Sequence, residues 1–139
     1  MENSEEILTW IDKAIAVWRG QQIELLPGAT IHRISEVEGV IGFKFPADFV
    51  NFYLRVNGFK DFGWNNDMFS MWPLGRIIEE YEEIDNDFVP FCDFLINSHQ
   101  IGFVKSQSGV FKSYDRSKPI ANSFKEAIEL INSNSDLIY

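Results

Sequence analysis

The chain has 139 residues, 45% of them hydrophobic, which is enough for one domain with a proper core and leaves little length for a second. Its 21 acidic residues outnumber 12 Lys and Arg and give a formal charge of -9. This balance argues against binding nucleic acid or an anionic membrane, since both need a basic surface. The acidity either keeps the protein soluble or attracts a basic partner.

The N-terminal residues and the cysteine content indicate a compartment. Residues 1–6 lack the positive segment and apolar run of a signal peptide. No stretch of the sequence reaches the ~20 apolar residues that a membrane span requires. Cys92 is the single cysteine, which excludes an internal disulfide and favours a reducing environment. We therefore expect a cytoplasmic protein.

Two helices are predicted in the first third of the chain. Apolar residues that recur every three or four positions indicate a first helix that ends at Gly20. Ser35 and Glu38 form a capping box, in which each side chain satisfies a backbone N–H of the other residue. This box predicts a short second helix that ends near Gly42.

A third helix should follow Phe45. Pro46 suits its first position, and its buried face is an apolar stripe that ends at Asn57-Gly58, a left-handed stop. The stripe comprises Phe49, Phe52, Tyr53 and Val56.

The second half of the chain is predicted to be mainly strand, with two more helices. Ser123 and Glu126 form another capping box, which predicts a last helix that ends near Asn132. The other expected elements are strands over 68–74, 88–96, 101–104 and 110–114, a helix over about 76–85, and a hairpin turn at 107–109. This order indicates an α+β fold. We expect a single domain over 1–139, with a central antiparallel sheet covered by N-terminal helices and one C-terminal helix.

Few residues in the sequence suggest catalysis or metal binding. His32, His99 and Cys92 stand at no metal-ligand spacing. Cys92 and His99 could form a nucleophile and base, but a thiol between Phe91 and Phe94 is more typical of a buried strand. We therefore expect no catalytic residue, no metal and no cofactor.

An acidic run and one tryptophan are the candidates for binding another protein. The run has no basic residue within it and is either a solvated helix face or a recognition patch for a basic partner. It comprises Glu79, Glu80, Glu82, Glu83, Asp85 and Asp87. Trp64 follows Gly63 in a predicted loop and is a candidate contact anchor, whereas Trp72 is predicted to lie in the core.

The sequence also resembles a known family over roughly residues 30–132. Its pattern comprises Ser35-Glu36-Val37-Glu38, then Gly42-Phe43-Lys44-Phe45-Pro46-Ala47-Asp48-Phe49, and then Asn57-Gly58. This order resembles the SUKH superfamily, which groups bacterial immunity proteins with a yeast cell-wall assembly regulator. The resemblance implies an α+β fold in which Glu38, Gly42, Pro46, Asn57 and Gly58 are structural signature residues, and it implies no catalytic residue.

The resemblance and the charge together give two functional hypotheses. The first is an immunity-type protein that binds and neutralises a cognate bacterial toxin domain, in particular a basic nuclease, through an acidic and aromatic surface. The alternative is a general regulatory or scaffold module with the same fold and no toxin partner. Exposed aromatic residues could also support a weak homodimer.

Overall fold

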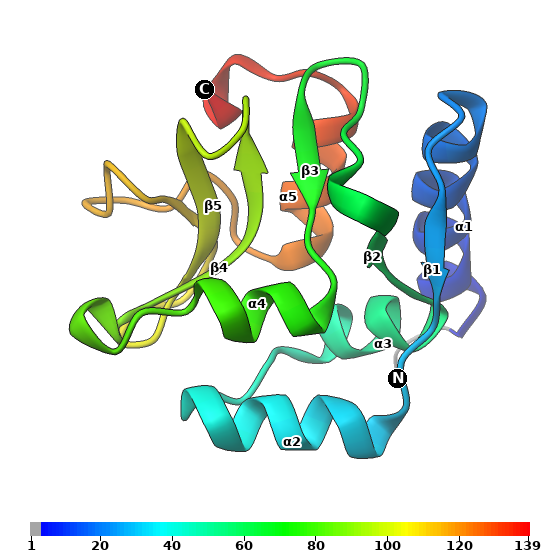
Figure 1. Cartoon of the computed structure of the whole chain (residues 1–139). Coiled ribbons are helices and arrows are strands. Elements are labelled where there is room, and N and C mark those ends of the chain that lie inside the picture. Colours follow the sequence, from blue (N-terminus) through cyan, green and yellow to red (C-terminus); the bar gives the residue numbers. More distant parts are fainter. Residues whose placement is uncertain (1–3) are drawn as a thin grey trace.

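The computed structural model describes residues 4–139, with the side chains of residues 10–82 and 84–139 (Figure 1). The helices are α1 (Ser4–Gly20), α2 (Ile31–Ile41), α3 (Ala47–Arg55), α4 (Leu74–Glu80) and α5 (Phe124–Asn132). The strands are β1 (Leu25–Pro27), β2 (Val56–Phe59), β3 (Phe69–Met71), β4 (Phe88–Phe94), β5 (His99–Val104) and β6 (Phe111–Lys112). This composition confirms the predicted α+β class.

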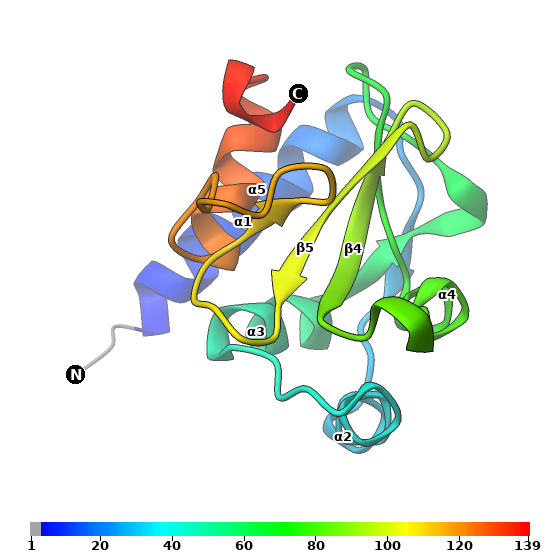
Figure 2. The same ribbon diagram turned by 90° about the vertical axis from the view of Figure 1, so that its left-hand side faces the viewer.

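The predicted central antiparallel sheet is present, together with a second, two-stranded antiparallel sheet that was not predicted. The larger sheet has the order β3-β4-β5-β6, and β1 pairs with β2 in a separate ribbon. In the larger sheet Phe88 lies opposite Val104, and Phe94 lies opposite His99. Figure 2 shows α1 and α5 on one side of β4 and β5, and α4 on the other. The face of the sheet toward α4 is therefore not covered by α1 or α5.

The core lies between the sheet and helices α1, α3 and α5, and it is built of aromatic rings. Phe124 of α5 lies 5.0 Å from Phe49 of α3 and 5.0 Å from Phe91 of β4, measured between ring centroids. Edge-to-face pairs of this kind stabilise a core beyond the area that they bury. The predicted stripe of α3 is confirmed, because Phe49, Phe52 and Tyr53 are all fully buried.

Helix α2 begins four residues earlier than the predicted capping box at Ser35. Thr30 is the N-cap, and its hydroxyl accepts a hydrogen bond from the Arg33 backbone N–H at 3.1 Å. Ser35 lies inside the helix, and the Glu38 carboxylate accepts instead from the Phe45 N–H at 2.8 Å. The helix ends at Gly42, as predicted, and Gly42 adopts the left-handed conformation. Glu38 thus fixes the connection from α2 to α3.

The connection from α3 to β2 differs from the predicted helix stop. Pro46 is the N-cap of α3 and not its first residue, and the helix passes directly into β2 at Val56. Asn57 lies in β2, where its side-chain oxygen accepts a hydrogen bond from Leu74 N–H at the start of α4, at 2.9 Å. Gly58 has a φ of 77°, which confirms the predicted left-handed conformation, but Gly58 lies within β2 and does not end a helix.

Helix α5 agrees with its prediction and is joined to α3 through one carboxylate. The Ser123 hydroxyl accepts from Glu126 N–H at 3.1 Å as the capping box predicts, whereas the Glu126 carboxylate accepts from Asn122 N–H at 2.8 Å and not from Ser123. The Asp48 carboxylate, in the first turn of α3, accepts from Lys125 N–H in the first turn of α5 at 2.8 Å. Two helix N-termini therefore share the negative charge of Asp48, which is favourable at both.

Replacing Asp48 with alanine is expected to destabilise the fold by about 1–3 kcal/mol, because charge-assisted hydrogen bonds to backbone N–H groups are lost. Asp12→Ala is the matched control, since Asp12 forms only an exposed ion pair with Arg55 and should contribute less than about 1 kcal/mol. Urea denaturation of both variants measures the difference. If Asp48→Ala were as stable as Asp12→Ala, the proposed role of Asp48 at the N-termini of both α3 and α5 would be wrong.

Candidate protein-binding face

The acidic run does not lie on one helix. Helix α4 begins at Leu74 and ends at Glu80, so the predicted helix over 76–85 is wrong at both ends. The chain leaves the helix at Tyr81, whose hydroxyl accepts a hydrogen bond from Lys105 Nζ at 2.7 Å. A 3₁₀ turn follows over Glu83–Asp85. Like charges at helical spacing would repel one another in a longer helix, and the structure spreads them over three local segments.

Two of the acidic residues are paired with arginines. Asp85 accepts two hydrogen bonds from Arg116, at 2.9 and 2.7 Å. These bonds lower the pKa of the Asp85 carboxyl and raise the pKa of Arg116. Glu80 lies 3.5 Å from Arg76, one helical turn earlier. The arginines hold both carboxylates in fixed positions.

The remaining acidic residues are less constrained. Asp87 accepts a hydrogen bond from the Ser106 hydroxyl at 3.3 Å. Glu79 and Glu82 are exposed, and within the described side chains neither forms an ion pair. The prediction for Glu83 falls outside the described side chains. Glu79 and Glu82 are therefore the carboxylates most available to a partner.

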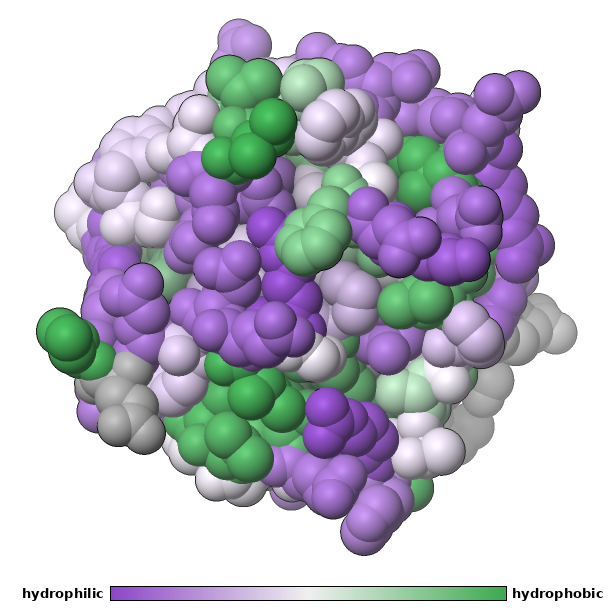
Figure 3. Space-filling model, viewed as in Figure 1, coloured by the Kyte–Doolittle hydropathy of each residue, from purple (hydrophilic) through white to green (hydrophobic). Residues whose placement is uncertain are grey.

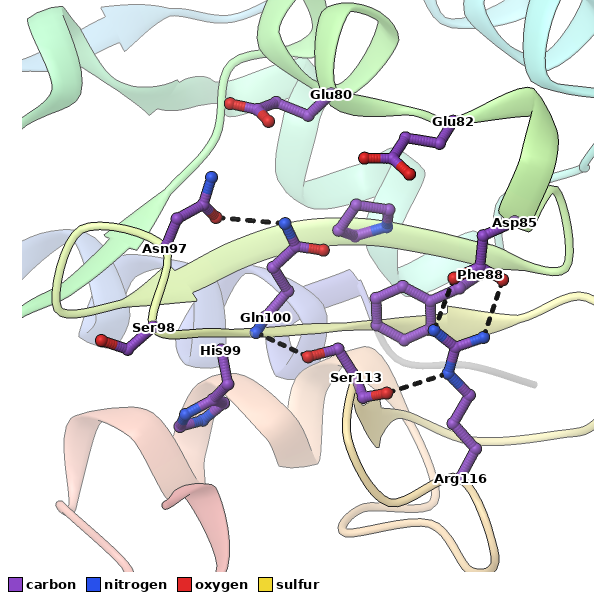
Figure 4. Close-up of a pocket in the computed structure, with 11 residues that line it drawn as sticks. Glu80, Glu82, Asp85, Phe88, Asn97, Ser98, His99, Gln100, Ser113 and Arg116 are labelled. Atoms are coloured by element: carbon purple, nitrogen blue, oxygen red, sulfur yellow. Dashed lines mark hydrogen bonds and ion pairs between the residues drawn. The ribbon is translucent and has the colours of Figure 1, made fainter.

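A polar groove of about 270 Å³ lies between the acidic segment and the larger sheet. In Figure 4 the side chains of Glu80 and Glu82 extend across it toward Asn97 and Gln100, which come from the β4–β5 hairpin. Asp85 and Arg116 close the other end, so three carboxylates and one guanidinium line the groove. Such a surface favours the positively charged or hydrogen-bonding groups of a ligand.

A buried ion pair underlies the groove. Asp93 of β4 is 2% exposed, accepts a hydrogen bond from Trp72 Nε1 at 2.5 Å and lies 3.2 Å from the Arg76 guanidinium. That guanidinium lies over the rings of Trp72 and Phe62, at 4.4 and 4.7 Å from their centroids. Sequence reasoning missed Asp93 as a structural centre. The sequence feature that could have indicated it is a carboxylate within the apolar run Phe88–Phe94, because a buried charge needs a partner.

Two aromatic side chains of the segment that precedes β3 are exposed. Trp64 is 46% exposed and Trp72 is fully buried, which confirms the surface and core positions predicted for them. The role of Trp64 as a contact anchor stays a prediction. Phe62 is 67% exposed beside Arg76. Figure 3 shows this side of the molecule as a hydrophilic central area with hydrophobic patches around it, an arrangement that can contact a partner by both kinds of surface.

The cysteine and the histidines lie in separate environments. Cys92 is buried, as predicted, and burial raises the pKa of its thiol, which disfavours the reactive thiolate. His99 begins β5 and is half-buried, with Nε2 2.8 Å from the Ile138 carbonyl. Burial lowers the pKa of His99. Across the described part of the chain, no three His, Cys, Asp or Glu residues form a metal-binding group.

The helices of residues 4–139 are too short or too polar for any of them to cross a membrane.

Helices α1 and α5 on one side of a short antiparallel sheet, with α4 and a groove lined by three carboxylates on the other, define a small α+β protein. The sequence matches the SMI1 / KNR4 family (SUKH-1) over residues 28–130, and the protein belongs to this family. The match confirms the predicted SUKH membership, which was expected over nearly the same residues. No curated protein matches the chain.

Proposed function

We infer that this protein acts by binding and not by catalysis, as an immunity-type protein that neutralises a cognate bacterial toxin domain with a basic surface, in particular a nuclease. The observation that carries this proposal is the groove in which Glu80, Glu82 and Asp85 meet. Membership of the SMI1 / KNR4 family (SUKH-1) supports it, because the SUKH resemblance implies toxin neutralisation for bacterial members.

The physical basis of neutralisation is competition with nucleic acid for the same basic surface. A nuclease needs positive charge where it binds phosphate. A partner with a net charge of -9 is attracted to that surface. Asp85 and Glu80 are already held by Arg116 and Arg76, so they lose little conformational entropy on binding. Trp64 is 46% exposed and would supply aromatic contact area to the same partner.

The test uses the toxin domain encoded beside the gene for this chain, in an inactivated form for binding and an active form for inhibition. The double variant Glu79→Gln, Glu82→Gln should associate about tenfold more slowly at low salt, because steering is reduced. The wild-type rate should fall between about 50 and 500 mM salt. Stopped-flow measurements give both rates, and nuclease assays show whether the wild type inhibits.

The matched control is Glu36→Gln, Glu129→Gln, which changes the net charge equally on the exposed surfaces of α2 and α5. This control should associate at nearly the wild-type rate. If the wild type were indifferent to salt and both double variants behaved alike, the acidic mechanism would be wrong. Binding without inhibition, or the lack of a toxin gene beside this one, would favour the regulatory or scaffold alternative.

A further inference from the structure

The four-residue turn that joins β4 to β5 has an unusual backbone. Leu95, Ile96 and Asn97 have φ values of 49°, 53° and 67°. Hairpin turns with successive left-handed residues favour Gly, Asn and Asp, because other side chains collide with the backbone there. A β-branched residue such as Ile96 is a conformational outlier in this region. The strand predicted through Ile96 ends instead at Phe94.

Hydrogen bonds from three directions hold this turn in place. The buried Asp93 carboxylate accepts from Asn97 N–H at 2.8 Å. Leu95 N–H donates to the Met68 carbonyl at 2.9 Å, and Ser98 N–H donates to the Phe94 carbonyl at 2.8 Å. The strained conformation is therefore imposed by its surroundings and is kept rigid.

The fold gains little from the two apolar side chains that the turn presents. Leu95 is 44% exposed and Ile96 is 72% exposed. Figure 3 shows a hydrophobic patch at this end of the β4–β5 hairpin. Glycine or asparagine at position 96 would relieve the strain and remove apolar surface from water. Strain and exposure at one residue are typical of a site kept for function.

The turn borders the acidic groove directly. Asn97 and Ser98 line one end of the groove, opposite Glu80 (Figure 4). On its other side the turn is bonded to Met68, which ends the loop that bears Trp64. A basic protein that places its charged groups in the groove would meet Leu95 and Ile96 at the end of the same surface.

We propose that Leu95 and Ile96 form a preformed hydrophobic anchor that inserts into an apolar depression beside the basic surface of the toxin domain. This inference rests on the proposed function and names the contact that retains the toxin after the acidic groove has attracted it. A rigid turn loses little conformational freedom on binding. The anchor should therefore act mainly by slowing dissociation.

The test is Ile96→Asn, since asparagine tolerates the left-handed conformation and lacks the apolar side chain. Its stability in urea should equal or exceed that of the wild type. Its complex with the inactivated toxin domain should dissociate about 10- to 100-fold faster, with the association rate nearly unchanged. Val40→Asn is the control, because Val40 is 62% exposed on α2 and should leave both rates unchanged.

Each other outcome overturns the inference. Unchanged dissociation of Ile96→Asn, with salt-dependent wild-type binding, removes the anchor but keeps the proposed function. A marked loss of stability in Ile96→Asn means that Ile96 serves the fold. Failure of the wild-type protein to bind the toxin domain overturns the proposed function and the anchor together. Ile96→Gly repeats the test with a second residue suited to the turn.

Discussion

Replacement of Asp93 with alanine is expected to lower the free energy of unfolding by up to about 3–5 kcal/mol, because it removes the buried carboxylate of an ion pair and leaves Arg76 with the more exposed Glu80 alone. Asp93 is 2% exposed and serves Arg76, Trp72 and Asn97 at once. Its loss would leave the Trp72 indole N–H without its acceptor and the Arg76 guanidinium without its closest carboxylate. The turn that carries Leu95 and Ile96 would lose the hydrogen bond that Asn97 N–H donates to Asp93.

Asp93→Asn separates charge from hydrogen bonding, since the amide oxygen can still accept from Trp72. We expect this variant to fall between the wild type and Asp93→Ala in urea denaturation. Combining Asp93→Ala with Arg76→Ala should cost less than the sum of the two single changes, because the pair acts as a unit. Additive losses, or an Asp93→Ala loss below about 1 kcal/mol, would show that the pair contributes no more than a surface salt bridge.

Gly58→Ala is expected to destabilise the protein by about 2–5 kcal/mol, from left-handed strain and overpacking combined. Gly58 has a φ of 77°, and an added Cβ would lie 2.6 Å from backbone atoms of Trp72 and Pro73. Backbone atoms cannot move aside as a flexible side chain can. The contact joins β2 to the segment between β3 and α4, so the clash would separate two parts of the fold.

Gly39→Ala is a control that should change the stability in the opposite direction. Gly39 is exposed within α2, and an added Cβ meets no atom within 4 Å. Alanine there should stabilise the helix by about 0.5–1 kcal/mol. Thermal and urea denaturation of the two variants should therefore move in opposite directions. A Gly58→Ala protein as stable as Gly39→Ala would contradict the close approach of the two backbones.

Local sequence patterns predicted the elements that depend on local contacts. The stripe of α3, the end of α2 at Gly42 and the N-cap Ser123 all depend on contacts within a few residues. The start of α2 was missed because Thr30 also fits an N-cap, and the Glu38 carboxylate that completes the Ser35 pattern is used by Phe45 instead. Asn57 was read as the end of a helix because its partner, Leu74, lies 17 residues further along the chain.

The candidate face was predicted only in part, because its contacts also join residues that are far apart in the chain. The local sequence predicted exposed side chains, as Glu79, Glu82 and Trp64 are. Arg116, however, approaches Asp85 from 31 residues away. No local pattern indicates that approach, so the groove could not be foreseen. Leu95 and Ile96 have the composition of a strand, and their left-handed conformation depends on Asp93 and Met68. Sequence reasoning fails there because the residues do not suit the turn they form.

The position of Phe124 has a consequence for how the protein is made. Its ring packs against rings of α3, β4 and β5, so the last helix completes a core that these earlier elements share. Chains emerge from the ribosome N-terminus first. A nascent chain that has not yet released α5 must therefore expose the apolar side of its sheet, and chaperones can bind it there until synthesis is complete.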